Sequence, residues 1–321
     1  ISFYTFQSVG YVVDVYWDKT KAERSFGKFA LFVSFFPQLV QGPISKFSQL
    51  APQLYAPKVF DSKELSFGLQ RMLWGYFKKL VVADTAMIAV KALVENKDGG
   101  FTGIYVFLLI LLYSAQIYGD FTGGIDITIG LSEMLGIRLA ENFDRPFSSR
   151  STKEYWRRWH ITMGTWFTDY VFYPLSVTKG MQRFSKWSRE TLGTAVGKRL
   201  PVYIATVVTW FLTGLWHGAG WNFIVWGLWH GTFLIIERIG WTKVLEKSNS
   251  VIQHLYTLTI VLIGWVIFRA DNLHIAWDFI YKMFSFDFNN SYYTQYAKIM
   301  TINSFNVLIA ILAIVLSFPI Y

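Results

Sequence analysis

Residues 200–236 read LPVYIATVVTWFLTGLWHGAGWNFIVWGLWHGTFLII, a stretch without lysine, arginine, aspartate or glutamate. About 20 apolar residues suffice for one helical crossing of a bilayer. The stretch is therefore long enough for two crossings, and Gly218-Ala219-Gly220 near its middle predicts a break between them. It also carries His217 and His230, and an ionisable side chain at membrane depth is a candidate functional residue.

The composition of the 321 residues agrees with several such crossings. Hydrophobic residues make up 53% and charged residues 16%, against about 25% charged residues in soluble domains. The mean hydropathy is +0.32, and 14 tryptophans, 18 tyrosines and 29 phenylalanines suit the aromatic belts of membrane interfaces. We therefore expect an all-α polytopic membrane protein. The absence of cysteine excludes disulfides and thiolate metal sites.

Uncharged runs mark the other candidate spans. Residues 99–119, 248–268 and 299–321 are clean runs of spanning length, whereas 125–139 is an amphipathic and weaker candidate. Each of the clean runs predicts one crossing.

Two further segments are expected to enter the membrane without forming a simple spanning helix. Residues 29–45 contain Pro37 and the pair Gly42-Pro43, which predicts a kinked or re-entrant segment. Residues 67–94 carry five charged side chains among apolar ones. They predict a tilted or interfacial helix whose lysines extend toward water.

Basic residues gather in the connections between these runs. Residues 144–158 and 179–199 are rich in arginine and lysine, so the positive-inside rule places both in the cytoplasm. Residues 269–288 are more acidic and are expected outside. This distribution accounts for the net charge of +9, and nucleic acid is not expected as a partner.

The segment 142–175 reads NFDRPFSSRSTKEYWRRWHITMGTWFTDYVFYPL. Ser151 followed by Glu154 has the spacing of a capping box and predicts a helix start. Arg157 and Arg158 are candidates to hold the phosphates of a cytosolic cofactor or of a phosphopantetheine arm, because guanidinium groups suit phosphate. The alternative is an interfacial helix with an aromatic belt and a basic cytoplasmic face.

The histidines have different settings. His217 lies at the predicted helix break, where irregular backbone at membrane depth has to be buried in protein or line a cavity, so we favour a catalytic role for it. A hydrogen bond between helices suits His230 better. Haem ligation by His160 and His217 stays open from spacing alone. Zinc is not expected, because no closely spaced set of histidines and carboxylates lies on one helix face.

Six motifs spread over most of the chain resemble the membrane-bound O-acyltransferase (MBOAT) superfamily, and specifically its alginate O-acetyltransferase membrane-subunit branch. They are ISFYTFQSVGYVVDVYW (1–17), FFPQLVQGPI (35–44), YSAQIYGDFTGGIDITIGLSEMLGI (113–137), ENFDRPF (141–147), YWRRWHITMGTWFTDYVFYPL (155–175) and GLWHGAGWNFIVWGLWHG (214–231). The chain is more distantly similar to the D-alanyl transferase of teichoic acid export.

This resemblance implies a ring of transmembrane helices with re-entrant segments around a central tunnel. It implies a cytoplasmic pocket for an acyl thioester and an outer funnel for the acceptor. His217 matches the active-site histidine of the family, and His160 matches its second histidine. Residues 1–321 are expected to form a single membrane domain in a bacterial inner (cytoplasmic) membrane, truncated at both ends.

The expected function is therefore transfer of an acyl group, acetyl by this resemblance, from a cytoplasmic thioester such as acetyl-CoA across the membrane. The acceptor is a hydroxyl of an extracytoplasmic polysaccharide, or of an acetyltransferase-like partner protein that passes the group on. His217 is the expected general base, and no metal is expected. The further candidate residues for binding are Arg157, Arg158, Trp159, Asp169 and Asn222.

Three alternatives remain at this point. The first is D-alanyl transfer from a carrier protein toward teichoic acid, which differs in its donor. The second is a channel or transporter without covalent chemistry. The third is a structural scaffold for an extracellular partner, in which the histidines only pack.

Overall fold

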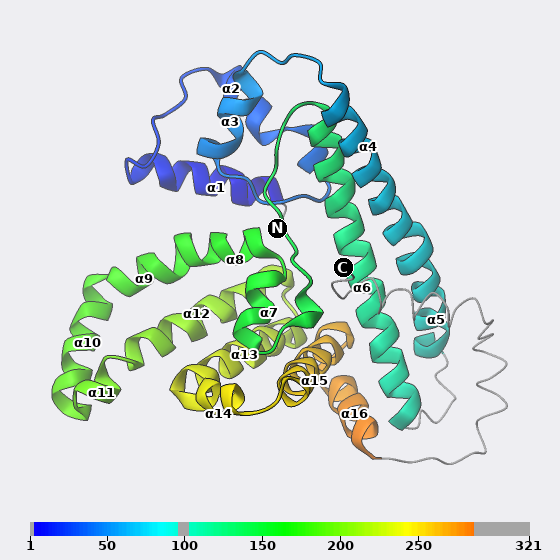
Figure 1. Ribbon diagram of the computed structural model, residues 1–321. Coiled ribbons are helices and arrows are strands. Elements are labelled where there is room, and N and C mark those ends of the chain that lie inside the picture. Colours follow the sequence, from blue (N-terminus) through cyan, green and yellow to red (C-terminus); the bar gives the residue numbers. More distant parts are fainter. Residues whose placement is uncertain (1–2, 96–102, 286–321) are drawn as a thin grey trace.

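The computed structural model describes residues 3–95 and 103–285, and within these ranges the regular structure is helical, apart from one isolated bridge between Phe143 and Trp159. The all-α prediction is thus confirmed (Figure 1). The α-helices are α1 (Phe3–Tyr16), α2 (Phe26–Val33), α3 (Phe47–Tyr55), α4 (Ser62–Tyr76), α5 (Asp84–Glu95), α6 (Gly103–Met134), α7 (Thr152–Arg158), α8 (Ile161–Phe167), α9 (Tyr173–Val177), α10 (Lys179–Leu192), α11 (Thr194–Gly197), α12 (Leu200–His217), α13 (Trp221–Ile236), α14 (Thr242–Lys247), α15 (Ser250–Arg269) and α16 (Leu273–Phe284). Short 3-10 helices cover Phe36–Gln38 and Pro146–Ser148, and π-helical segments cover Phe77–Ala83, Thr168–Phe172 and Glu237–Trp241.

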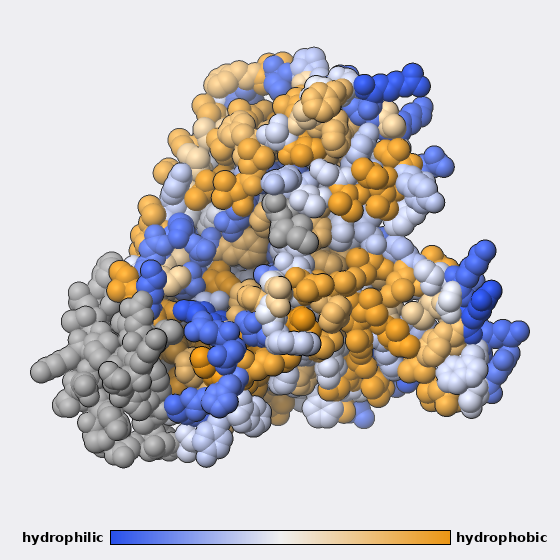
Figure 2. All heavy atoms as spheres, turned by 180° about the vertical axis from the view of Figure 1, so that it is seen from behind, coloured by the Kyte–Doolittle hydropathy of each residue, from blue (hydrophilic) through white to orange (hydrophobic). Residues whose placement is uncertain are grey.

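Three of the described helical stretches are long and apolar enough to cross a membrane. They are Val106–Met134, Thr194–His217 and Ser250–Arg269. On α12 the apolar residues Val207, Phe211 and Leu215 form an exposed stripe at helical spacing, as expected where a helix meets lipid. Figure 2 shows hydrophobic side chains over much of one face of the molecule and hydrophilic ones gathered mainly at its edges. The predicted span 299–321 lies outside the described residues.

The break predicted between α12 and α13 is confirmed. The first helix ends at His217, the second begins at Trp221, and the two pack against each other. A Cβ atom at Gly227 would collide with the carbonyl oxygen of Trp210, so only glycine permits this close approach. The 200–236 stretch therefore turns back on itself beside His217.

The treatment of 125–139 as a separate candidate was wrong, because α6 runs unbroken for 32 residues and ends only at Met134, within that segment. Figure 1 shows α4 and α5 running along α6. Glycines of α6 do not break the helix, because they pack closely against α4. A Cβ at Gly75 would lie 2.6 Å from the carbonyl oxygen of Gly123, and Gly68 and Gly130 oppose each other in the same way.

The charged side chains of residues 67–94 also differ from expectation. The predicted extension of lysines toward water fails for Lys78, which is mostly buried and pairs with Asp126 of α6 at 2.5 Å. Arg71 contacts the same carboxylate at 3.1 Å and Glu141 at 2.6 Å. Opposite charges on α6 thus hold these cations inside the helix pair, where leaving them unpaired would be costly.

The kink predicted for residues 29–45 is confirmed, since α2 gives way to a 3-10 turn and then to irregular chain before α3. The buried amide group of Gln38 stabilises this irregular backbone. It donates to the carbonyl oxygen of Pro43 and to the hydroxyl of Ser45, each at 2.7 Å. Its oxygen accepts a hydrogen bond from Gln7 of α1 at 3.1 Å.

Candidate active site

His217 lies among aromatic rings at the end of α12. Its ring centroid is 4.5 Å from that of Trp216, 4.8 Å from that of Trp226 and 5.2 Å from that of Phe268. The Nε2 atom of His217 is buried and has no hydrogen-bond partner among the described residues. The imidazole is thus held in place by ring contacts, with a polar atom left available.

Several other buried ring nitrogens around His217 share this condition. Within the described part of the chain, no hydrogen-bond partner reaches Trp156 Nε1, His160 Nε2, Trp216 Nε1, Trp226 Nε1 or His230 Nδ1. Buried polar groups are normally paired, and an unpaired one costs about 1–3 kcal/mol. A concentration of unpaired nitrogens around one histidine is typical of a site that receives a polar ligand.

Two cavities adjoin α8 and share part of its surface. The larger has a volume of about 490 Å³ and the smaller about 180 Å³. Ile161 and Thr165 line both, while Met163 and Phe167 face only the larger and Thr162 and Trp166 only the smaller. These two shared side chains form the ridge between the cavities. The larger volume falls in the range of about 300–1,000 Å³ that is usual for ligand pockets.

The larger cavity combines charge with apolar wall. Lys153, Arg157 and Asp169 line it, together with Trp156 and other residues of α8 and α12. Among those on α12 is a threonine one helical turn before His217, Thr213. Charged side chains beside an apolar wall suit a ligand with an anionic part and a short apolar part.

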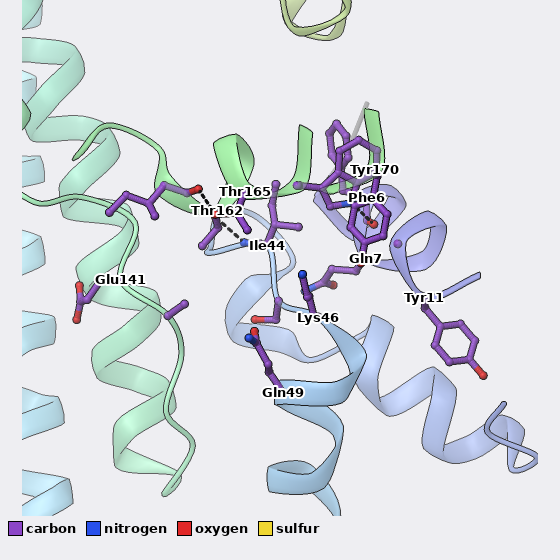
Figure 3. Close-up of a pocket in the computed structure, with 15 residues that line it drawn as sticks. Phe6, Gln7, Tyr11, Ile44, Lys46, Gln49, Glu141, Thr162, Thr165 and Tyr170 are labelled. Carbon is purple, nitrogen blue, oxygen red and sulfur yellow. Dashed lines mark hydrogen bonds between the residues drawn. The ribbon is translucent and has the colours of Figure 1, made fainter. Parts of the chain in front are cut away.

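The smaller cavity is more polar. The side chains labelled in Figure 3 include Gln7 from α1, Lys46 and Gln49 from the start of α3, and Thr162 from α8. The hydroxyl of Tyr170 also lines it and donates to Asp14 at 2.8 Å. Burial, together with this hydrogen bond, raises the pKa of the Tyr170 hydroxyl above its ordinary value, so it stays a donor.

Aromatic contacts link His217 to the walls of both cavities. Phe6 lines the smaller cavity, and its ring lies 5.3 Å from that of Trp216. Trp156 lines the larger cavity, and its ring lies 5.7 Å from that of Trp226. Because both Trp216 and Trp226 contact His217, two aromatic rings lie between the histidine and each cavity, and His217 itself lines neither.

The two candidate arginines have separate surroundings. Successive helical residues point about 100° apart, so α7 directs Arg157 into the larger cavity and Arg158 elsewhere. Arg158 pairs with Glu154 at 2.8 Å and approaches the hydroxyl of Ser148 at 3.3 Å. Arg157 has no carboxylate within 4 Å among the described residues. Of the two arginines only Arg157 lines the larger cavity, and anion binding there stays a prediction.

Trp159 and Asn222 are placed differently from what their proposed binding role requires. Trp159 is buried in an aromatic cluster, stacked on Tyr155 and 5.2 Å from Trp265, and lines neither cavity. The buried amide of Asn222 donates to the carbonyl oxygen of Ala270 at 3.1 Å and so ties α13 to the end of α15. Both residues have packing roles here.

Asp169 does line the larger cavity, and it pairs with Lys46 of the smaller cavity at 2.5 Å. This ion pair links the two cavity walls beside α8. The capping prediction for Ser151 is confirmed, since its hydroxyl accepts from the backbone of Glu154 at 3.1 Å. The carboxylate of Glu154 accepts from the backbone N–H of Arg150 instead of that of Ser151.

His160 is buried at the junction of α7 and α8, with φ 48° and ψ 52°. This left-handed conformation costs a non-glycine residue roughly 1–3 kcal/mol and is concentrated at functional sites. The ring of His160 lies 6.1 Å from that of Trp216 and 4.8 Å from that of Phe121. The structure thus gathers His160 and His217 around one tryptophan, although they are far apart in sequence.

His230 packs against Trp226 at 5.3 Å and Trp156 at 4.8 Å, and faces Gly264 of α15. Because the chain reverses after His217, both histidines of the 200–236 stretch contact Trp226. His230 itself is buried and lines neither cavity, and its structural role stays a prediction. Within residues 3–95 and 103–285, no group of three or more His, Asp or Glu side chains has the arrangement of a metal site.

The fold and this site define a polytopic all-α membrane protein with a half-buried histidine that aromatic contacts link to two cavities. The family model described as MBOAT, membrane-bound O-acyltransferase family, matches residues 18–251. The chain belongs to the membrane-bound O-acyltransferase family.

Relatives of known name fall into three groups. The "probable alginate O-acetylase AlgI" of Azotobacter vinelandii is 39% identical over 89% of this chain and 53% of its own length. A peptidoglycan O-acetyltransferase of Helicobacter pylori is 33% identical over 86% of this chain and 54% of its own length. A teichoic acid D-alanyltransferase of Streptococcus thermophilus is 27% identical over 78% of this chain and 59% of its own length. The chain spans about half the length of these relatives.

Three residues of the site were not singled out from sequence. Trp226 contacts both histidines, Asn142 contacts His160, and Glu237 binds the start of α7. Asn142 and Glu237 make contacts that are distant in sequence, and Trp226 is one of many aromatic residues, so no local pattern marks them. The one available signal is the high tryptophan content of residues 210–229, which indicates aromatic packing around His217.

Proposed function

We propose that the protein is a membrane O-acyltransferase that transfers an acyl group, acetyl in the favoured case, from a cytoplasmic thioester to a hydroxyl on the other side of the membrane. The observation that supports this most directly is the position of His217, which a pair of contacting aromatic rings links to each of two cavities. A donor and an acceptor that enter from different sides need such a shared centre.

In the proposed reaction, His217 accepts the proton of the acceptor hydroxyl. The hydroxyl oxygen then forms a bond to the thioester carbonyl carbon, and the carbonyl electrons move to its oxygen. When this tetrahedral intermediate collapses, the carbon–sulfur bond breaks and the thiolate receives the proton from His217. A positioned general base contributes roughly 10²–10⁴-fold to such a reaction. Unpaired N–H groups nearby supply donors to the oxyanion.

The larger cavity is the proposed donor pocket. Lys153 and Arg157 at this cavity provide positive charge for the phosphates of coenzyme A or of a phosphopantetheine arm. Both lie in the basic segment 144–158, which the positive-inside rule assigns to the cytoplasm. The smaller, more polar cavity then belongs to the acceptor side.

Acetyl transfer is favoured over D-alanyl transfer, because the relatives named as O-acetylases or O-acetyltransferases are more similar to this chain than those named D-alanyltransferases. We place the protein in the inner membrane of a bacterium. Its acceptor is an extracytoplasmic polysaccharide, or a partner protein that passes the acyl group on.

The test is acyl transfer by the protein in proteoliposomes supplied with radiolabelled acetyl-CoA or with a D-alanyl carrier protein. We expect acetyl-CoA to be consumed and the label to appear on a hydroxyl acceptor. His217→Ala should abolish transfer at an unchanged protein level, while His274→Ala, on the exposed surface of α16, should not. Transfer at the wild-type rate by His217→Ala would overturn the catalytic role. Use of the D-alanyl carrier alone would favour the alternative.

A further inference from the structure

A chain of hydrogen bonds ends on His160. The backbone N–H of Ile44 donates to the hydroxyl of Thr162 at 2.9 Å, a contact visible in Figure 3. That hydroxyl lies 2.8 Å from Asn142 Oδ1, and the backbone N–H of Thr162 lies 3.0 Å from the same oxygen. The amide nitrogen of Asn142 is 3.2 Å from Nδ1 of His160. All four residues are buried.

The direction of each bond in this chain is determined. The backbone nitrogens of Ile44 and Thr162 can only donate. The hydroxyl of Thr162 therefore accepts a hydrogen bond from the N–H of Ile44 and donates one to Asn142 Oδ1. The oxygen of Asn142 must face the N–H of Thr162, because a flipped amide would set two donors against each other. Both lone pairs of that oxygen are then in use.

The Asn142 amide therefore has a proton to give to His160. Its Oδ1 also comes within 3.3 Å of His160 Nδ1, which offers the opposite polarity. That bond would be a third one on an oxygen that already accepts two from Thr162. The amide nitrogen is closer and has no other use among the described contacts, so it donates to Nδ1. In the neutral ring the proton is then on Nε2.

Nε2 of His160 is buried and has no hydrogen-bond partner among the described residues. The ring cannot turn freely, because it is buried against Phe121 and Trp216 and is hydrogen-bonded at Nδ1. Trp216, which contacts His217, is also the neighbour of His160. An N–H group is thus fixed in the aromatic layer beside the proposed base.

We propose that Asn142 is a positioning residue that holds His160 in its Nε2–H form, so that His160 donates a hydrogen bond to the carbonyl oxygen of the acyl group while His217 takes the hydroxyl proton. This division of roles rests on the proposed function. It assigns the two histidines opposite tasks, one as donor and one as acceptor, and Asn142 with Thr162 determines which task His160 has.

The substitution that tests this is Asn142→Asp, which keeps the size of the side chain. One carboxylate oxygen still accepts both hydrogen bonds from Thr162, and the other accepts a hydrogen bond from His160 Nδ1–H. The neutral ring then loses the proton on Nε2. Removing one oxyanion donor costs about 10²–10³-fold in rate, and we expect a loss of that size. Asn272→Asp is the matched control, because either side chain caps α16 through its oxygen.

The tautomer is read directly from ¹⁵N chemical shifts of the ring nitrogens in protein labelled only at its five histidines. The signals of His160 are assigned by their loss in His160→Gln. We expect a protonated Nε2 and an unprotonated Nδ1 in the wild type, and the reverse in Asn142→Asp. A wild-type His160 protonated on Nδ1, or on both nitrogens, overturns the inference without any variant.

Activity provides the second arm. An Asn142→Asp protein that shows the reversed tautomer and transfers acyl groups at the wild-type rate overturns the donor role of His160. A wild type that transfers no acyl group overturns the proposed function and, with it, this role. An active wild type with the wrong tautomer overturns the present inference alone.

Discussion

The carboxylate of Glu237, at the end of α13, accepts a hydrogen bond from the backbone N–H of Thr152, the first residue of α7, at 2.6 Å. The next backbone N–H, that of Lys153, donates to the same carboxylate at 3.0 Å. Glu237 is fully buried, so its charge is stabilised by these amides and by the N-terminal end of α7. The helix that carries Arg157 toward the larger cavity is thereby anchored to the helix that follows His217.

Glu237→Ala should therefore destabilise the protein. Two buried backbone donors lose their partner, which corresponds to about 2–4 kcal/mol in the free energy of unfolding. Glu237→Gln keeps one acceptor oxygen and should lose about half as much. Denaturant titration in detergent micelles measures both. Glu246→Ala, on the exposed side of α14, is the control. Equal stability of Glu237→Ala and wild type would refute the anchoring role.

Arg157 and Arg158 should differ in their effect on the donor. Arg157→Ala removes a positive charge from the larger cavity, and we expect the KM for acetyl-CoA to rise about three- to tenfold with little change in kcat. Arg158 lines neither cavity, and Arg158→Ala removes its contacts with Glu154, Ser148 and Asp144, so its KM should stay within about twofold. Steady-state kinetics in proteoliposomes separates them. A larger change in KM for Arg158→Ala would show that the donor binds elsewhere.

The glycine contacts between α4 and α6 should tolerate no side chain. Gly75→Ala would bring a Cβ to 2.6 Å from the Gly123 carbonyl oxygen, so the two helices have to move apart. We expect a loss of about 1–3 kcal/mol, seen as a lower thermal unfolding temperature in detergent. Gly180→Ala on α10 has open space around its Cβ and should be neutral or slightly stabilising. A neutral Gly75→Ala would contradict the close packing.

The ion pair between Lys46 and Asp169 should couple the two cavity walls. Because both side chains are partly exposed, its energy is modest, and we expect each single alanine variant to lower the acyl-transfer rate about two- to fivefold. The double variant should lose less than the product of the two single losses, since it leaves no unpaired charge. Rates that multiply independently would mean that the pair does not act as a unit.

Local patterns in the sequence predicted much of the fold. The break after His217 follows from two nearby glycines, and the cap at Ser151 follows from a residue three positions later. The continuity of α6 could not be predicted in the same way. Whether Gly119 and Gly123 end a helix depends on a neighbouring backbone that covers them, and that neighbour is a contact distant in sequence.

The candidate site divides similarly. Its histidines stand out because they are rare in an apolar chain, but their surroundings depend on tertiary contacts. Trp159 and Asn222 carry side chains suitable for binding. In the fold, however, Trp159 packs inside an aromatic cluster, and Asn222 donates a hydrogen bond to Ala270. Conversely, the contact between Asn142 and His160 depends on the left-handed backbone conformation of His160, which no periodic pattern in the sequence reveals.

The ridge formed by Ile161 and Thr165 sets a limit on distance. A molecule in either cavity is separated from one in the other by side chains of a single helix, whose full width is roughly 10 Å. Under the proposed function, the acyl group is the only part of either reactant that has to pass this single helix, and the bulky parts stay in separate compartments. A partition one helix thick thus keeps the contents of the two compartments apart at close range.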